Sequence, residues 1–231
     1  MSLSERQERI FDLLCEHKKL SVSSLSKTLY VTEITVRRDL TEMEQMGYIR
    51  RYRGGAILPP DANGVPVTQR MFIDEAEKKE LARRGSSFLR DGMTVFIDSS
   101  TTSHFLIPHI KKKNGIRIVT NSVNALMIAS NMQIPCHLIG GDYSAPEMCC
   151  VGPLANELAQ RMNVDIAFMS TQGIADDGRI TDSFMEVTAV KECILKNARQ
   201  TVFMFETSKK NKTGSYTLCR ADSENVTVIS I

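Results

Sequence analysis

Small hydroxyl, glycine and lysine residues follow several predicted strands in the second half of this chain. Asp98-Ser99-Ser100-Thr101-Thr102 comes directly after the apolar run at 94–97, and Glu206-Thr207-Ser208-Lys209-Lys210 follows the run at 201–205. Hydroxyl and N–H groups at a strand end suit phosphate oxygens, and lysine suits their charge. Because ligands of parallel sheets sit beyond the carboxyl ends of the strands, we expect one site there for a phosphorylated or polyhydroxylated compound.

Further strand ends carry the same kinds of residue. They are Asn121-Ser122 after 116–120, Gly140-Gly141-Asp142 after 134–139, and Ser170-Thr171-Gln172-Gly173 after 164–169. Each segment alone also suits a helix cap or a turn, and Lys191 and Lys209 also suit a solvated surface. The hypothesis of one ligand site therefore rests on the segments taken together.

A second set of residues suits DNA. Arg38 is expected on the outward face of a short helix, where it can reach a base edge in the major groove. Arg50, Arg51 and Arg53 stand beside the turn residues Gly54-Gly55 and suit phosphates or the minor groove. The alternative is a solvated face on which nearby carboxylates balance these arginines. The predicted DNA-binding residues are Thr32, Thr35, Arg37, Arg38, Thr41, Arg50, Arg51 and Arg53.

Three short amphipathic helices and a hairpin are expected to position the arginines. The first helix is expected at 4–16, the second after the N-cap Ser21 and the third after the N-cap Thr32. The third helix has an inward stripe at i, i+4 and i+7, made of Val36, Leu40 and Met43. The opposite face then carries Ile34, Arg38 and Thr41. This order of elements predicts an α+β winged helix-turn-helix domain over residues 1–58.

A proline-rich stretch separates this domain from the rest of the chain. Residues 59–66 hold three prolines and one glycine, so we expect a linker over 59–71. From 72 to 231, short apolar runs alternate with amphipathic stretches. That alternation predicts an α/β domain with a mainly parallel sheet, which we interpret as a sensor domain that binds an effector.

Composition excludes several classes of protein. With 231 residues, 42% of them apolar and 24% charged, the chain is neither disordered nor collagen-like. The net charge of +2 restricts nucleic-acid binding to a local cluster. No apolar stretch is long enough to span a membrane, and the charged N-terminus does not resemble a signal peptide. The six cysteines and four histidines lack metal-site spacing, so we expect reduced thiols, no metal, no cofactor and a cytoplasmic location.

The helix-turn-helix residues also carry a family resemblance. Val31-Thr32-Glu33-Ile34-Thr35-Val36-Arg37-Arg38-Asp39-Leu40, followed by Arg53-Gly54-Gly55-Ala56, resembles the signature of the DeoR family of bacterial transcription regulators. The resemblance continues through 98–102, 120–121, 140–141, 151–154, 173–174, 186 with 191, and 207–209, in the order usual for the family. It implies a C-terminal sensor domain related in fold to ribose-5-phosphate isomerase, which binds sugar phosphates or related metabolites.

The resemblance extends the predicted ligand site to further positions. The full set of predicted ligand-binding residues is Asp98, Ser99, Ser100, Thr101, Thr102, Asn121, Gly140, Gly141, Gly173, Glu186, Lys191 and Lys209. Three positions depart from the family, which usually has glycine at 100, often has glycine at 170 and usually has aspartate at 206. A side chain at Ser100 narrows the space beside a bound phosphate, since glycine alone lets a backbone approach without a Cβ.

Two other classes of function compete with a ligand-controlled regulator. An isomerase fused to a DNA-binding domain would need a free carboxylate base, for which Asp98, Asp182 and Glu186 are the candidates. The isomerases have an acidic cluster where this chain reads Ser170-Thr171-Gln172-Gly173, so we expect no catalytic residues and no enzyme activity. The third class is an architectural DNA-binding protein with an idle second domain.

The sequence therefore predicts a transcription regulator, most simply a repressor of a carbohydrate-metabolism operon. Its expected partners are double-stranded operator DNA, a small-molecule effector such as a phosphorylated sugar, and further copies of itself in a dimer or tetramer, without a membrane. The predicted mechanism is that the effector binds one conformation of the second domain better than another and so changes DNA affinity.

Overall fold

The computed structural model describes residues 3–58 and 67–231. The chain divides into two compact units, Met1–Asp74 and Glu75–Ile231, each with its own hydrophobic core. Most of the expected linker, residues 59–66, lies outside the described residues. The end of the expected linker includes the short helix α4 (Val67–Arg70), which belongs to the first unit.

The first unit contains three helices, α1 (Glu5–His17), α2 (Val22–Leu29) and α3 (Glu33–Gln45). The side chains of Ser4, Ser21 and Thr32 cap them by accepting a backbone N–H three residues on, as the sequence predicts for Ser21 and Thr32. The predicted stripe of α3 is fully buried in the core.

A small antiparallel sheet completes the first unit. The wing strands β2 (Arg50–Tyr52) and β3 (Gly55–Ile57) pair with each other, and β1 (Lys19–Ser21), which the sequence analysis missed, pairs with the other edge of β3. A Cβ at Gly55 would collide with the backbone oxygen of Leu20, so the approach of β1 to β3 requires glycine. These elements confirm the predicted winged helix-turn-helix.

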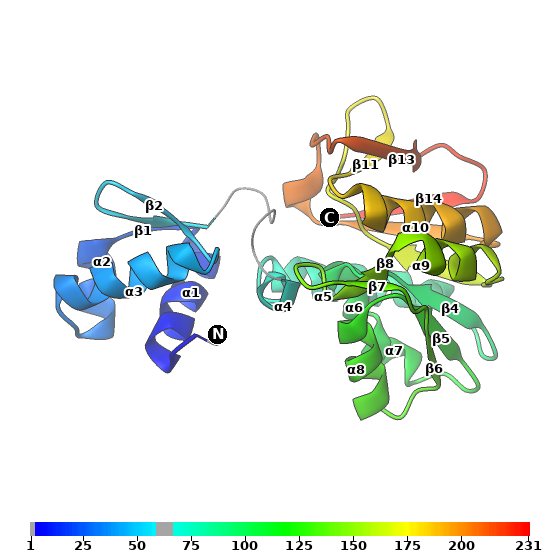
Figure 1. The fold of residues 1–231 in the computed structure, drawn as a ribbon, viewed down its shortest axis with the longest axis horizontal. Coiled ribbons are helices and arrows are strands. Elements are labelled where there is room, and N and C mark those ends of the chain that lie inside the picture. The colour runs from blue at the N-terminus through cyan, green and yellow to red at the C-terminus, as the bar shows by residue number, and fades with distance from the viewer. Residues whose placement is uncertain (1–2, 59–66) are drawn as a thin grey trace. The chain divides into compact units, whose positions relative to one another are not determined.

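The second unit is built on a six-stranded sheet in the order β14-β12-β9-β4-β5-β6, in which every pairing is parallel (Figure 1). The strands are β4 (Thr94–Ile97), β5 (Arg117–Thr120), β6 (Cys136–Leu138), β9 (Ile166–Met169), β12 (Thr201–Phe205) and β14 (Val226–Ser230). This sheet confirms the predicted α/β architecture with a mainly parallel sheet.

Helices cover both faces of this sheet. Alternate strand residues enter two separate cores, Val95 and Ile97 in one and Phe96 in the other. The first core also contains side chains from α5 (Glu75–Gly85), α7 (Ile107–Ile110) and α8 (Val123–Asn131). The second contains side chains from α9 (Gly152–Gln160) and α10 (Met185–Asn197). The strands are therefore buried on both faces, as their apolar runs predict.

Two smaller sheets lie outside the six-stranded sheet and its helices, and neither was predicted from the sequence. One is the hairpin of β7 (Asp142–Ser144) and β8 (Cys149–Val151). The other has the order β10-β11-β13, with β10 (Gly173–Ile174), β11 (Arg179–Asp182) and β13 (Tyr216–Arg220). Between β4 and β5 the chain forms two short helices, α6 (Thr101–His104) and α7.

Candidate functional site

On the outward face of α3, the polar side chains form hydrogen bonds and ion pairs with one another. The hydroxyl of Thr32 caps the helix and lies 3.0 Å from the hydroxyl of Thr35. Arg37 pairs with Glu33 at 3.0 Å and Arg38 with Glu42 at 3.1 Å, each one helical turn apart. Both arginines remain exposed, and exposed pairs of this kind contribute little stability, so either guanidinium can exchange its carboxylate for DNA at small cost.

The wing carries the second group of predicted DNA-binding residues. The guanidinium of Arg51 donates to the hydroxyl of Thr41 at 2.6 Å, and its backbone N–H donates to Glu44 at 2.7 Å, so strand β2 is tied to α3. Arg50 and Arg53 are exposed and pair with no carboxylate in the part of the chain that the structure describes. The wing therefore presents a positive surface joined to the outward face of α3.

In the second unit, three buried carboxylates and two predicted lysines meet beside the carboxyl ends of β4, β9 and β12, with Asp182 supplied by β11 and Lys191 by α10. Asp98 ends β4 and has no exposed surface. It accepts hydrogen bonds from the hydroxyls of Ser100 and Ser103, at 2.5 and 2.6 Å, and from the backbone N–H of Ser170 at 3.0 Å. The residues that follow β4 thus bond back to the carboxylate of Asp98, and Ser100 is also the N-cap of α6.

Lys191 links Asp98 to a second carboxylate that was not among the predicted ligand residues. Its ammonium lies 3.3 Å from Asp98 and 2.7 Å from Asp182, and it donates to the backbone oxygen of Ser170 at 2.6 Å. The Lys191 side chain is only 5% exposed. Lys191 therefore sits between two buried carboxylates as an internal counter-ion.

The charged forms of Asp98 and Lys191 stabilise each other. Burial by itself raises the pKa of Asp98, but Lys191 and the bonds from Ser100, Ser103 and Ser170 together hold it below its usual value. Burial likewise lowers the pKa of Lys191, and the two aspartates more than reverse this, so its pKa lies above its usual value. Asp98 and Lys191 are consequently charged at neutral pH.

Glu206, at the end of β12, organises a neighbouring cluster that reaches the surface. Its carboxylate lies 3.0 Å from Lys209 and accepts the hydroxyl of Thr102 at 2.6 Å. Lys209 also donates to the hydroxyl of Ser170 at 2.7 Å. Burial raises the pKa of Glu206, but Lys209 and Lys78 outweigh burial and hold it below its usual value. The Lys209 side chain is 23% exposed, so this ammonium can meet a ligand from solvent.

Helix α5 is attached to the same cluster through its first turn, which sequence reasoning missed. The ammonium of Lys78, in α5, lies 3.9 Å from Glu206, and both side chains are buried. Glu77 accepts the backbone N–H of Thr207 at 2.7 Å. Because α5 is the first helix of the second unit, the loop that carries Lys209 is fixed to the element at which this unit begins.

The remaining predicted ligand residues, apart from Glu186, lie in the segments that follow strands of the six-stranded sheet. Ser99, in the loop after β4, and Thr101, the first residue of α6, are buried, and Asn121, directly after β5, donates to the backbone oxygen of Cys150 at 3.0 Å. Gly140 and Gly141 follow β6, and a Cβ at Gly141 would lie 2.5 Å from the backbone oxygen of Val151. Gly173 begins β10, and a Cβ there would lie 2.5 Å from the backbone oxygen of Lys212. These residues lie at the expected strand ends.

Glu186 differs from the rest of the set. It stands in the first turn of α10 with an exposed side chain, whereas Lys191 on the same helix is buried. It forms no ion pair with the described lysines and arginines. The structure therefore does not join Glu186 to the buried cluster.

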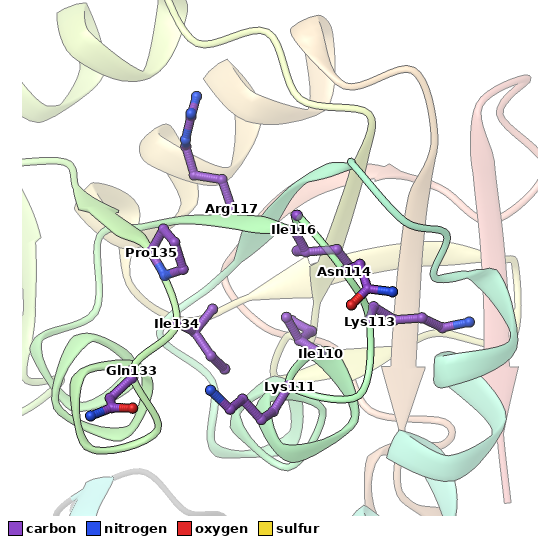
Figure 2. Close-up of a pocket in the computed structure, with 10 residues that line it drawn as sticks. Ile110, Lys111, Lys113, Asn114, Ile116, Arg117, Gln133, Ile134 and Pro135 are labelled. Atoms are coloured by element: carbon purple, nitrogen blue, oxygen red, sulfur yellow. The ribbon is translucent and has the colours of Figure 1, made fainter.

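A pocket lies at the opposite edge of the sheet. It has a volume of about 340 Å³ and is lined by the segment Ile110–Arg117 without Lys112, and by Gln133, Ile134 and Pro135, next to the amino ends of β5 and β6. In Figure 2 the charged ends of Lys111, Lys113 and Arg117 point in different directions. These cations do not converge on one point, so the pocket does not form a second anion site.

Across residues 3–58 and 67–231, no three His, Cys, Asp or Glu side chains are placed to hold a metal ion. The six cysteines are free thiols, and burial raises the pKa of Cys149 to about 12. Among the described helices, none has both the length and the apolar character of a membrane span.

Comparisons with known proteins identify both units. A model of the DeoR-like helix-turn-helix domain matches residues 6–61, and a model of the DeoR C terminal sensor domain matches residues 73–230. The chain is 27% identical over 212 residues to the glycerol-3-phosphate regulon repressor of Escherichia coli, covering 90% of this chain and 83% of that protein. It is 30% identical over 218 residues to the transcriptional repressor GlcR of Bacillus subtilis, covering 94% and 84%.

A further relative and a solved structure complete the comparison. The L-fucose operon activator of Escherichia coli is 30% identical over 213 residues, covering 90% of this chain and 87% of that protein. Ribose 5-phosphate isomerase A of Methanocaldococcus jannaschii has a TM-score of 0.45 at 17% identity, covering 59% of this chain and 55% of that one. This last likeness is too distant to carry a functional argument.

Proposed function

The chain belongs to the DeoR family of transcription regulators, and on this premise we propose that a phosphorylated sugar or related metabolite controls its binding to operator DNA. The DNA is read by the outward face of α3, while the wing arginines hold phosphates. The regulated genes belong to carbohydrate metabolism, and the protein represses them. The names of the relatives, which concern glycerol 3-phosphate and L-fucose, support this class of effector.

The observation that carries the effector site is the partly exposed end of a buried polar cluster, at Lys209. Asp98, Asp182 and Glu206 are matched by Lys191, Lys209 and Lys78, so the cluster is close to neutral without a ligand. Of these three lysines, Lys209 has the most exposed side chain, and hydroxyls of Thr102 and Ser170 lie beside it. An ammonium flanked by hydroxyls fits a ligand that combines an anionic group with sugar hydroxyls.

The same contacts favour a switch over an enzyme. An isomerase requires a carboxylate free to take a proton from the substrate. Asp98 and Asp182 are bound by Lys191, and Glu206 is bound by Lys209 and by the hydroxyl of Thr102. With each buried carboxylate already engaged, the site supports binding rather than proton abstraction.

We propose that α5 transmits the state of the site. An anionic ligand that draws Lys209 away from Glu206 leaves Lys78 as the nearest cation to this buried carboxylate. The first turn of α5, held by Lys78 and Glu77, then changes its position relative to β12. Since the chain enters the second unit through α5, this change reaches the linker and alters how two DNA-binding units are held.

The protein is proposed to act in the cytoplasm as a homo-oligomer, either a dimer or a tetramer. One winged helix reads only a few base pairs, and symmetric assemblies on repeated half-sites supply the remaining specificity.

The DNA-binding half of the proposal is tested by contrasting two arginines. Arg38→Ala is expected to reduce discrimination between operator and a single-base variant by about 1–3 kcal/mol, because Arg38 reads a base. Arg51→Ala is expected to weaken binding to all sequences and to lower the salt slope by about one, because Arg51 holds a phosphate. Fluorescence anisotropy across a salt series measures both, on duplexes that the full chain selects from random DNA.

Arg161→Ala is the matched control. Arg161 is exposed and pairs with a glutamate one turn away, as Arg38 does, but it lies in α9's C-cap in the second unit. It is expected to leave both quantities unchanged. If Arg38→Ala retained full discrimination, its assignment as a base reader would be wrong. If Arg51→Ala lost affinity for one sequence only, Arg51 would be a base reader instead.

A further inference from the structure

The two most exposed large apolar side chains of the described residues lie together in the helix-turn-helix. Tyr30 is 95% exposed and Ile34 is 81% exposed. Tyr30 ends α2 in the left-handed conformation, with φ of 54°, and Ile34 is the second residue of α3. The turn between the two helices therefore presents apolar surface beside the arginines of α3.

Ile34 differs from its neighbours in what its side chain can contact. Thr35 and Thr41 are hydrogen-bonded within the unit, and Arg37 and Arg38 each hold a glutamate. Ile34 lies on the face opposite the buried residues Val36, Leu40 and Met43, and it belongs to no hydrophobic cluster of the described residues. A branched apolar side chain at such a position contributes nothing to the core and lowers helix propensity slightly.

We propose that Ile34 determines part of the operator sequence by packing on the 5-methyl group of a thymine in the major groove. The amino-terminal residues of a recognition helix are the ones that face base edges. In the major groove only thymine offers a methyl group, and an aliphatic side chain has no hydrogen bond to give to the other bases. The surrounding arginines direct this surface toward the polyanion.

This assignment rests on the DNA-binding role of α3 and adds a specificity residue to it. It is tested on the highest-affinity duplex that the full chain selects from random DNA, with each thymine replaced in turn by deoxyuridine. This replacement removes one methyl group and leaves base pairing intact. Because a buried methyl contributes about 0.8 kcal/mol, one position per half-site is expected to lose about fourfold in affinity with the wild-type chain.

The variants Ile34→Ala and Ile34→Val complete the cycle. With Ile34→Ala, the affinity for the thymine duplex falls by a similar factor for each half-site that is bound, and the deoxyuridine penalty disappears. Ile34→Val keeps both branches at Cβ and retains most of the penalty. The side chain is exposed, so neither variant opens a cavity in the unit.

Two outcomes would overturn the assignment, and they differ in meaning. If the deoxyuridine penalty were absent, or equal in wild type and Ile34→Ala, Ile34 would not read a methyl group while specific DNA binding would stand. If the wild-type chain selected no sequence at all, the role of α3 in operator recognition would fall together with this assignment.

Discussion

Replacement of Lys191 by methionine is expected to destabilise the second unit by about 3–5 kcal/mol at pH 7. Lys191 is the shared counter-ion of Asp98 and Asp182, and all three side chains are buried. Removal of one partner from a buried ion pair leaves a buried charge without its counter-ion, and the remaining hydrogen bonds to Asp98 do not replace that attraction. Since whole domains have about 5–15 kcal/mol of stability, this loss is a large fraction of the total.

The pH dependence distinguishes this cause from a simple packing defect. In the native unit the pKa of Asp98 is held low, so its contribution is present above the unfolded value, about 3.9, and is lost as pH falls below it. Without Lys191, burial raises the pKa of Asp98 in the folded state. Stability of the variant then increases as pH falls through that raised value toward the unfolded one, so the deficit relative to wild type is largest at neutral pH and shrinks as the solution becomes more acidic.

Urea unfolding followed by circular dichroism measures the deficit, and hydrogen exchange in β4 and β9 assigns the transition to the second unit. Lys196→Met is the matched control, because Lys196 lies on the same helix with an exposed side chain. It is expected to change stability by less than about 0.5 kcal/mol. A deficit of Lys191→Met that stayed constant from pH 7 down to about pH 4, near the unfolded pKa of aspartate, would contradict the counter-ion role.

Replacement of Lys78 by methionine is expected to disable the response to the effector. Lys78 and Lys209 both lie beside Glu206, so under the proposed route Lys78 is the cation that remains when a ligand draws Lys209 away. In the variant, the same movement would leave Glu206 buried and unpaired, which opposes ligand binding. We therefore expect effector affinity to fall at least tenfold and the shift in operator affinity to fall below about twofold, while operator affinity without effector is retained.

Calorimetry with the effector and anisotropy with the operator separate the two effects. Lys79→Met is the control, since Lys79 is the next residue of α5, is exposed, and pairs with Glu75 one turn away. This variant is expected to behave as wild type in both assays. If Lys78→Met kept normal effector affinity and a full shift in operator affinity, α5 would not be part of the transmission route.

The sequence was sufficient to predict the elements whose patterns are local. The buried stripe of α3 and the N-caps Ser21 and Thr32 are set by spacing and by residues three positions apart. The strands β4 and β12 have the predicted bounds, because each is a continuous apolar run buried on both faces. By contrast, β1 and β10 are two or three residues long and exist only through partners far along the chain.

The sequence was sufficient to predict at which edge of the sheet the candidate site lies, but not which side chains pair with each other there. The carboxyl ends of β4 and β12 place Asp98 and Lys209 at the expected edge, because the parallel topology requires it, and Lys191 reaches them from α10. That Lys191 is enclosed by Asp98 and Asp182 depends on the small β10-β11-β13 sheet, which the sequence analysis missed. In the sequence, Lys78 is one of several charged residues on a polar helix. Only its position beside the buried Glu206 in the structure distinguishes it from Lys79.

The most direct test of the account is the affinity of the full chain for its operator at fixed salt, with and without each member of a sugar-phosphate panel. Fluorescence anisotropy on DNA from upstream of its own gene provides the measurement. The account predicts that one compound changes the affinity about tenfold, equivalent to about 1.4 kcal/mol of coupling, and that Lys209→Met removes this change. A compound that bound the second unit tightly and left operator affinity unchanged would contradict it.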